Sequence, residues 1–276
     1  MTRPSVGVVT IAHGRHDHLT AQHSSLARGT RVPDRYVVVA MGDPALGPAH
    51  RDGLHREVAR VDPAPDGLPL AAARNAGARW LADLDVLVFL DVDCLAGRDL
   101  VAAYADVACG APERVWSGPV TYLPPASAGY ELERLDELDD PHPARPAPPP
   151  GTVVEEGDPD LFWSLSFALG QSAWQRTGGF CEEYVGYGGE DTDFARVAAR
   201  AGLGLGWVGS ARAYHQFHPV ASPPVQHLSD IVRNARLFHD RWGSWPMGGW
   251  LDEFERRGLV VRDDAGTPRV VASVRG

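Results

Sequence analysis

Two groups of carboxylates, about a hundred residues apart, are the side chains in this sequence best suited to chemistry. Asp91 and Asp93 follow the apolar run of residues 86–90, and Glu190 and Asp191 follow a glycine-rich stretch. Carboxylates at the edge of an apolar core lose hydration and repel one another, so they persist mainly where a cation or a proton neutralises them. We therefore expect both groups to belong to one reaction site.

The first pair, Asp91 and Asp93, is expected to bind a divalent metal. On an extended segment side chains alternate with period 2, so both carboxylates point to the same side. Such a pair leaves coordination positions for water and phosphate oxygens, which is typical of Mg²⁺ or Mn²⁺ carrying a diphosphate. The structural alternative is a strand end with two solvated aspartates, and the second acidic group favours the metal site.

The second group lies in residues 186–191, which read Gly-Tyr-Gly-Gly-Glu-Asp and open a stretch predicted to be helical as far as Arg200. Glycines adopt backbone conformations closed to other residues and let another molecule approach closely. Acidic residues in a first helical turn also complement the helix dipole, which is the structural alternative. The glycines and the neighbouring Tyr184 and Tyr187 favour an acceptor-binding loop that delivers a general base.

Two histidines near the end of the predicted core, His215 and His218, are candidate metal ligands. Histidines three residues apart converge on one cation only where the chain turns, because on a straight strand they face opposite ways. We therefore expect one ligand and favour His215. The remaining histidines, including His16, His18 and His23, carry no sequence signal as ligands.

The composition excludes several classes of function. The chain has 276 residues, 44% of them apolar, which suits one large domain or one domain with a C-terminal elaboration. A net charge of -10 argues against a nucleic acid or an anionic membrane as the main partner. All 26 basic residues are arginine. Without lysine there is no Walker-A phosphate loop and no Schiff-base chemistry.

Cysteine usage and hydropathy indicate the compartment. The three cysteines, Cys94, Cys109 and Cys181, lack Cys-x-x-Cys spacing, which indicates neither a zinc knuckle nor a disulfide framework. No segment approaches the roughly 18 consecutive apolar residues of a membrane span, and the N-terminus lacks a signal-peptide hydrophobic region. We expect a cytoplasmic protein, for which peripheral contact with a membrane-bound acceptor is compatible with the sequence.

Strands and helices alternate through the first part of the chain. Strands are expected at residues 6–12, 36–41, 55–61 and 86–90, and helices at residues 17–28 and 70–81. This alternation predicts an α/β fold with a largely parallel sheet, whose ligand crevice lies outside the carboxyl ends of the strands. Asp43, Asp62 and Asp91 all follow such strand ends.

The second half is less regular. The expected elements are a helix at residues 100–107, strands at 115–122 and 165–169, a helix at 225–242, a short helix ending at Arg257 and a hairpin at 260–271. Residues 141–150 contain six prolines, which favours extended polyproline geometry or disorder. We interpret them as a mobile loop near the acceptor side rather than as a domain boundary.

The order and spacing of these motifs resemble the GT-A-fold glycosyltransferases. Residues 89–93 (Phe-Leu-Asp-Val-Asp), 70–77 (Leu-Ala-Ala-Ala-Arg-Asn-Ala-Gly) and 188–191 (Gly-Gly-Glu-Asp) are most similar to the family-2 enzymes. The last motif is also similar to the β-1,4-galactosyltransferase and polypeptide GalNAc-transferase families. The resemblance covers roughly residues 5–218. It implies a Rossmann-like, mostly parallel sheet flanked by helices, with a C-terminal helical elaboration.

The resemblance also implies a reaction. A sugar is transferred from a nucleotide-diphosphate donor, with UDP favoured, to an acceptor hydroxyl, with inversion at the anomeric carbon and with Mn²⁺ or Mg²⁺ as cofactor. Asp93 and His215 would hold the metal, with His218 as the alternative ligand. Asp91 would contact the metal through water, or the donor ribose.

The same resemblance assigns the donor site. Ala12, His13 and Asp43, at the first two strand ends, are expected to contact the nucleobase and ribose, and Arg74 and Asn75 to face the nucleotide. In family-2 enzymes an acidic pair usually follows the second strand. Here that pair is replaced by Ala-Met-Gly-Asp, so the identity of the base stays open.

On the acceptor side, Asp191 matches the base position of Gly-Gly-Glu-Asp enzymes, and Glu190 would hydrogen-bond the acceptor or the donor sugar. Sugars present C–H faces that stack on aromatic rings, so Trp163 and Tyr187 are candidate acceptor contacts. Gly188 and Gly189 complete the predicted acceptor loop. Trp174 reads instead as a core residue of a helix packed on the sheet.

We expect a catalytic domain at residues 1–220, with a nucleotide-binding half at about 1–95 and an acceptor-binding half at about 96–220. Residues 221–276 would be helices and a hairpin packed on the same domain. Two alternatives remain: a sugar-1-phosphate nucleotidyltransferase, which the absence of lysine disfavours, and a non-catalytic carbohydrate-binding protein, which the intact acids at both sites disfavour.

Overall fold

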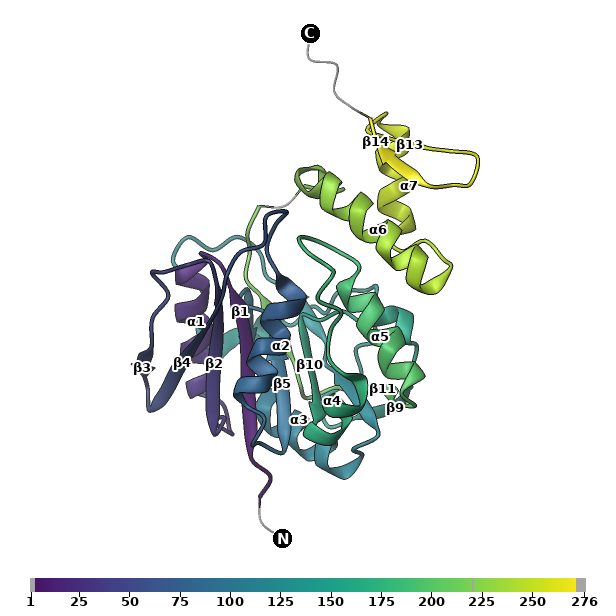
Figure 1. The fold of residues 1–276 in the computed structure, drawn as a ribbon. Helices are drawn as coiled ribbons and strands as arrows, with labels where there is room; N and C mark the ends of the chain where they lie inside the picture. Colours follow the sequence, from purple (N-terminus) through teal and green to yellow (C-terminus); the bar gives the residue numbers. More distant parts are fainter. Residues whose placement is uncertain (1–2, 220, 272–276) are drawn as a thin grey trace.

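A nine-stranded sheet forms the centre of the protein in the computed structural model, which describes residues 3–219 and 221–271 (Figure 1). The strand order is β3-β4-β2-β1-β5-β10-β7-β11-β9. The strands are β1 (Val6–Ala12), β2 (Arg35–Met41), β3 (Ala49–Arg51), β4 (Leu54–Val61), β5 (Val86–Leu90), β7 (Arg114–Ser117), β9 (Val153–Gly157), β10 (Ser166–Gly170) and β11 (Gly204–Val208).

The half of the sheet formed by β4, β2, β1 and β5 is parallel, whereas β10 runs antiparallel to β5 and β7. Every residue of β1 and β5 is buried, as expected for strands covered by helices on both faces. Alternate residues of β1 face opposite layers: Val6 and Val8 belong to one apolar core, and Val9 and Ile11 to the other.

Helices cover both faces of this sheet. The first core contains side chains of α1 (His16–Ala27) and α3 (Leu100–Gly110). The second contains side chains of α2 (Leu70–Trp80), α4 (Gln171–Thr177) and α5 (Glu190–Arg200). Trp174 lies in this second core, where its ring stacks on Phe89. These contacts confirm the predicted mixed α/β fold with a mainly parallel central sheet flanked by helices.

A second, three-stranded sheet was not predicted and matters for the site. It consists of β6 (Cys94–Ala96), β12 (Ala213–His215) and β8 (Val120–Tyr122), in the order β6-β12-β8. The single strand predicted at residues 115–122 is wrong, because β7 and β8 belong to different sheets. Gly118 and Pro119 separate them, and proline has no N–H to continue a ladder of hydrogen bonds.

The proline-rich residues 141–150 run along this small sheet instead of projecting from the molecule. Pro141 forms an isolated β-bridge with Thr121, and the His142 N–H donates to the Val120 carbonyl (2.9 Å). The Arg145 side chain is buried. The expected mobile loop is therefore a packed segment, fastened to β8 through Pro141 and His142 and closed by a hydrogen bond from the Arg145 N–H to the His142 carbonyl (3.3 Å).

The C-terminal part has its own small apolar core. It comprises α6 (Leu228–Trp242), α7 (Gly248–Arg256) and the hairpin of β13 (Val260–Arg262) and β14 (Pro268–Val270). These elements lie at the end of the molecule opposite to the N-terminus (Figure 1). Short 3-10 turns complete the fold: η1 (Leu132–Leu138), η2 (Pro159–Leu161) and η3 (Val225–His227).

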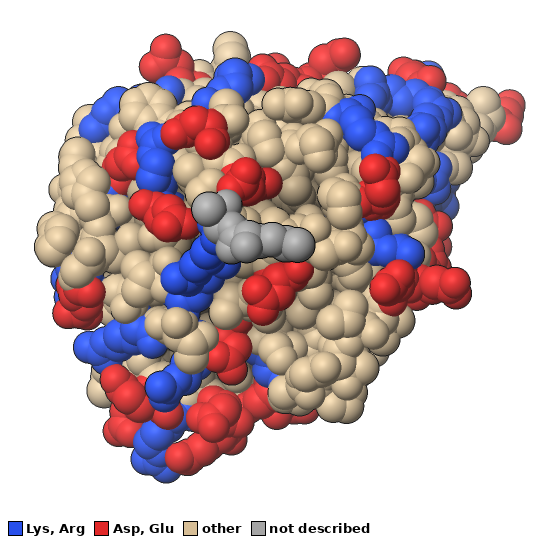
Figure 2. All heavy atoms as spheres, turned by 90° about the horizontal axis from the view of Figure 1, so that it is seen from below, with Lys and Arg blue, Asp and Glu red and all other residues tan. Residues whose placement is uncertain are grey.

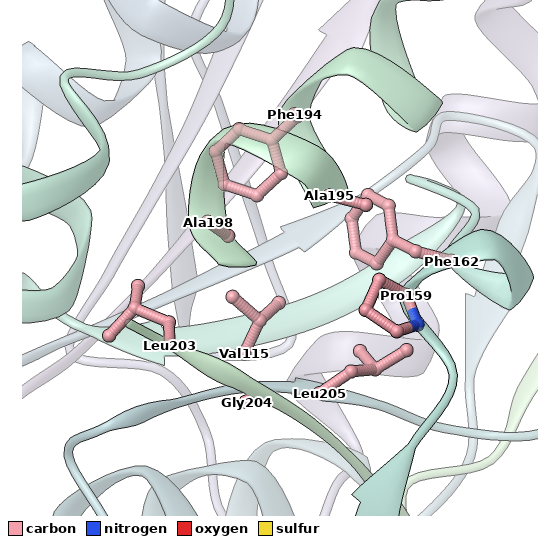
Figure 3. Close-up of a pocket in the computed structure, with 9 residues that line it drawn as sticks. All are labelled: Val115, Pro159, Phe162, Phe194, Ala195, Ala198, Leu203, Gly204 and Leu205. Atoms are coloured by element: carbon pink, nitrogen blue, oxygen red, sulfur yellow. The ribbon is translucent and has the colours of Figure 1, made fainter. Parts of the chain in front are cut away.

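The lower face of the molecule and one small hollow differ in the side chains that they present (Figures 2 and 3). Acidic and basic side chains are interspersed on the face seen from below (Figure 2). A small hollow between η2, β7, β11 and α5 is lined by apolar side chains such as Phe162, Phe194 and Leu205, so it belongs to the core (Figure 3). Within the described residues, no helix is both long and apolar enough to span a membrane.

Candidate active site

The Asp91-x-Asp93 pair lies in a turn, not on an extended strand as predicted. β5 ends at Leu90, and the Cys94 N–H donates to the Asp91 carbonyl (2.8 Å) to close the turn. The two carboxylates therefore have different partners. Asp93 faces a group of histidines, and Asp91 faces an arginine.

Asp93, His215 and His218 each offer one ligand atom, and these atoms lie within 4.8 Å of one another. The small sheet explains the meeting, because His215 pairs with Cys94, the residue after Asp93. β12 ends at His215, and the next N–H, of Gln216, donates to the Asp93 carbonyl (2.7 Å). The strand ends there, and His218 Nε2 comes 3.5 Å from Asp93 Oδ2. Both histidines therefore lie beside Asp93, so the straight-strand argument for a single ligand does not apply.

A third histidine, His18, was missed. Its Nδ1 hydrogen-bonds Asp93 Oδ1, and its ring centroid lies 6.3 Å from that of His218. Arg15 Nε also lies 3.6 Å from Asp93 Oδ1. Neither residue has a motif. Their placement follows from the packing of α1 against β6, which local sequence does not encode.

The electrostatics of this group suit a cation. Burial lowers the pKa of His215 to about 4, which keeps its imidazole in the neutral form that binds metals. Its ring stacks on Tyr122 with centroids 4.6 Å apart, which fixes its plane. One carboxylate with two imidazoles suits a first-row divalent metal. The donor set therefore fits a metal site.

Arg74 joins the two acidic groups. Its Nη2 lies 3.1 Å from Asp91 Oδ1 and its Nη1 lies 3.3 Å from Glu190 Oε1. The arginine is only 3% exposed. A guanidinium presents several donors in a fixed plane, which lets one side chain bridge two carboxylates from distant segments.

Glu190 and Asp191 open α5 directly after Gly189, whose φ of 92° is left-handed. Burial and the neighbouring Asp191 charge raise the pKa of Glu190 to about 7, and burial likewise raises the pKa of Asp191. Glu190 Oε2 is buried and has no hydrogen-bond partner among residues 3–219 and 221–271. This pair can therefore accept or donate a proton near neutral pH.

The predicted nucleobase contacts lie together at the ends of β1 and β2. His13 Nδ1 lies 2.7 Å from the Met41 carbonyl, and Ala12 ends β1. Asp43 accepts hydrogen bonds from the Gly14 N–H (2.9 Å) and from His16 Nε2 (3.0 Å). The Gly14 N–H in particular holds the pKa of Asp43 below its ordinary value. Asp43 thus fixes the loop after β1.

Asn75 has a different environment from its neighbour Arg74. Its Oδ1 accepts from the Phe180 N–H (2.8 Å), and its Nδ2 donates to the Phe180 carbonyl (2.9 Å) and to Glu182 Oε1 (2.8 Å). With these contacts the amide already fastens the loop after α4 to α2. These contacts give Asn75 a structural role, and its contact with the nucleotide stays a prediction.

The two predicted acceptor aromatics also differ. Trp163 is half-buried, with the Arg145 guanidinium 4.7 Å from its ring centroid and His142 against its edge. Tyr187 is 40% exposed and lies in the loop with Gly188 and Gly189 that precedes Glu190. Tyr187 is therefore the more accessible of the two rings.

Comparisons with known proteins agree with this arrangement. Residues 160–219, which include the Gly-Gly-Glu-Asp motif, match the family described as the N-terminal domain of galactosyltransferase. The chain is 31% identical over 217 residues to a validoxylamine A glucosyltransferase of Streptomyces hygroscopicus subsp. limoneus, covering 69% of this chain and 47% of that protein. The chain is also 31% identical to a validoxylamine A glucosyltransferase of Streptomyces hygroscopicus subsp. jinggangensis, covering 69% of this chain and 50% of that protein. The chain thus spans about half the length of these relatives.

Solved structures show the same fold. The S. aureus TarS fragment 1–349 in complex with UDP-GlcNAc superposes with a TM-score of 0.59 at 14% identity, covering 92% of this chain and 72% of that one. GalNAc-T7 with UDP, GalNAc and Mn²⁺ gives a TM-score of 0.56 at 14% identity, covering 94% and 58%. The chain therefore has the GT-A fold, and it is similar in sequence to the named glucosyltransferases over part of its length.

Proposed function

We propose that this protein transfers a sugar from a UDP-sugar to an acceptor hydroxyl in a metal-dependent, inverting reaction. The observation that carries the proposal is the bridge from Arg74 to both Asp91 and Glu190. It sets the carboxylates expected on the diphosphate side next to those expected on the acceptor side.

The comparisons support a first substrate pair. The relatives are named glucosyltransferases acting on validoxylamine A, and the TarS structure contains UDP-GlcNAc. UDP-glucose with validoxylamine A is therefore the pair to test first. Residues 1–220 would form the catalytic domain, with the nucleotide on the side of residues 1–95 and the acceptor on the side of residues 96–220. The C-terminal helices would pack on that domain.

Asp93, His215 and His218 would hold the metal, with His18 orienting Asp93 through its hydrogen bond. When bound, the metal stabilises the negative charge that develops on the departing diphosphate. Asp91, already paired with Arg74, would contact the donor ribose or reach the metal through water.

Asp191 would act as the general base. The acceptor oxygen forms a bond to the anomeric carbon as the bond from that carbon to the diphosphate oxygen breaks, and the acceptor proton passes to Asp191. Attack from the side opposite the leaving group inverts the anomeric centre. Glu190, whose Oε2 is unpartnered among the described residues, would hydrogen-bond an acceptor or sugar hydroxyl.

The test is turnover by the full chain and by Asp191→Asn. The wild type with Mn²⁺, UDP-glucose and validoxylamine A is expected to release UDP and to form a glycoside of inverted anomeric configuration, read by NMR. Asp191→Asn is expected to lower kcat by about 10²–10⁴-fold while it still binds UDP, because only the base is lost. Full activity of Asp191→Asn would contradict the assigned base.

A further inference from the structure

We propose that the C-terminal helices complete the acceptor site, and that Tyr187, His227 and Trp250 together form an aromatic shelf that binds a polyhydroxylated ring. The inference rests on the proposed function and deepens it, because it adds two acceptor-contacting residues from outside the catalytic domain and names the chemical class of the acceptor.

The three rings of the aromatic shelf come from separate elements. Tyr187 lies in the loop before α5, His227 ends η3, and Trp250 lies in the first turn of α7. The rings of Tyr187 and His227 are stacked, with centroids 4.7 Å apart and planes 15° from parallel. Trp250 lies 5.8 Å from Tyr187 at 31°. Tyr187 is 40% exposed, and the other two rings are half-buried, so the shelf is open to a ligand.

The loop that carries Tyr187 is fastened to α6. Asn234, which is fully buried, donates from Nδ2 to the carbonyls of Val185 (3.0 Å), Tyr187 (3.3 Å) and Gly188 (2.9 Å). The Tyr187 N–H in turn donates to Asp230 Oδ2 (3.3 Å). The backbone on both sides of the Tyr187 ring is thus held by the C-terminal helix.

Two glycines of the loop exist because of this close approach. A Cβ on Gly186 would lie 2.2 Å from Asp230 Oδ2, and one on Gly188 would lie 2.7 Å from the Met247 sulfur. Both glycines have positive φ, 71° and 92°, which other residues rarely adopt. Gly186 and Gly188, which in the sequence suggested close approach by a ligand, therefore allow close approach by α6 and by the start of α7. In this proposal the ligand contacts the rings of the aromatic shelf instead.

The aromatic shelf lies close in the chain to the proposed base. Tyr187 precedes Glu190 and Asp191 by only a few residues, and those two acids open α5 directly after the loop. Burial, with smaller contributions from the charges of Asp191 and Glu190, raises the pKa of Tyr187. In this proposal a ring stacked on Tyr187 offers a hydroxyl group to Asp191.

The ligand class follows from this surface. Exposed aromatic faces bind the C–H faces of rings, whereas acyclic polyols offer no flat face to stack. Asp230, which contacts both the Tyr187 N–H and His227, is a carboxylate that accepts hydrogen bonds from hydroxyl groups. A cyclic acceptor with several hydroxyl groups therefore matches both the aromatic faces and the hydrogen-bond acceptors of the aromatic shelf.

Saturation-transfer NMR on the full chain with UDP and Mn²⁺ tests the aromatic shelf. The probes are methyl β-glucoside and myo-inositol as rings, and glucitol as the acyclic control. Wild type and Trp250→Phe are expected to transfer saturation to the ring protons of the cyclic probes, and Trp250→Ala to lose most of that signal. Trp245→Ala is the matched control, since Trp245 lies between α6 and α7 but stacks on His239.

The inference is overturned if the wild type shows no transfer to either ring probe, or if Trp250→Ala matches the wild type. Equal transfer to glucitol would overturn the ligand class. Calorimetric binding of UDP with Mn²⁺ is measured on the same samples. Trp250→Ala is expected to bind UDP like the wild type. Loss of the saturation-transfer signal with unchanged UDP binding would therefore be a loss at the aromatic shelf and not at the donor site. Absence of UDP binding by the wild type would instead count against the proposed function.

Discussion

At the scale of single residues, Arg74 is the side chain that pairs with a carboxylate from each acidic group. The buried Arg74 lies against the carboxylates of Asp91 and Glu190, and its positive charge offsets the repulsion between them. Removing one partner of a buried ion pair leaves an uncompensated charge, whereas an exposed pair contributes little.

Arg74→Met is therefore expected to lower the free energy of unfolding at pH 8 by about 3–5 kcal/mol, measured by urea denaturation. Arg79→Met is the matched control on the same helix. Arg79 is 67% exposed and its nitrogen lies 3.5 Å from Glu182, so its loss should cost within about 0.5 kcal/mol. Equal, small losses in both variants would show that Arg74 does not hold the acidic groups together.

The raised pKa values of Glu190 and Asp191 predict an unusual pH profile. A base must be ionised, so kcat/KM falls as the pH drops through its pKa. Free carboxyl groups titrate near about 4, whereas burial places the pKa of Glu190 at about 7. Burial also raises the pKa of Asp191, the proposed base, so we expect the acid limb of kcat/KM well above the pH at which a free carboxyl group titrates.

Glu190→Gln removes one negative charge beside Asp191 and should therefore move this limb to lower pH. The measurement is kcat/KM between pH 5 and pH 9 for both proteins, at saturating Mn²⁺. A wild-type limb below pH 5, or an identical limb in Glu190→Gln, would exclude the coupled pair as the titrating group.

At the scale of elements, α6 positions the loop that leads to the base. Asn234→Asp is nearly isosteric but replaces the donating amide with an acceptor, which then faces three carbonyl oxygens. The loop is expected to loosen, with faster amide hydrogen exchange at residues 185–189 and at least about tenfold lower kcat/KM, while UDP binding is retained.

Arg236→Ala is the matched control for this loop, since Arg236 lies on the same helix but donates to the Pro268 carbonyl of the hairpin. It is expected to leave exchange at residues 185–189 unchanged. If Asn234→Asp also leaves it unchanged, α6 does not position the loop.

The elements also show what sequence can and cannot predict. β1, β2 and β5 are apolar runs followed by polar residues, so their existence and the parallel sheet were predictable, whereas the more polar β4 gave a weaker signal. β6 and β8 have three residues each, too few to give a pattern. Their pairing with β12 nevertheless places His215 next to Asp93. Site residues that belong to a local sequence motif were therefore predictable. The meeting of His215 with Asp93 was not, because it depends on the pairing of two three-residue strands.

The same limit explains the residues that were missed. His18 follows no motif and reaches Asp93 only through the packing of α1. His218 was only the alternative ligand, because on a straight strand it would face away from His215, but β12 ends at His215. Trp250 and His227 lie in the C-terminal part, and only the tertiary structure brings them to Tyr187.

At the scale of the whole molecule, Asp43 and the turn at Asp91 both lie at the carboxyl ends of parallel strands and therefore at one edge of the sheet. The small sheet places His215 next to Asp93 at this edge. The C-terminal helices lie beyond this edge and hold the loop that precedes the proposed base (Figure 1). The central claim is that this edge binds a nucleoside diphosphate through a metal held by Asp93 and the histidines.

Isothermal titration with UDP, with Mn²⁺ and with EDTA in its place, tests this claim most directly. The wild type should bind UDP tightly only with Mn²⁺, and Asp93→Ala should lose that metal-dependent binding. Asp62→Ala, which removes a carboxylate that follows strand β4 of the same sheet, should keep it. Metal-independent UDP binding that is unchanged in Asp93→Ala would contradict the account.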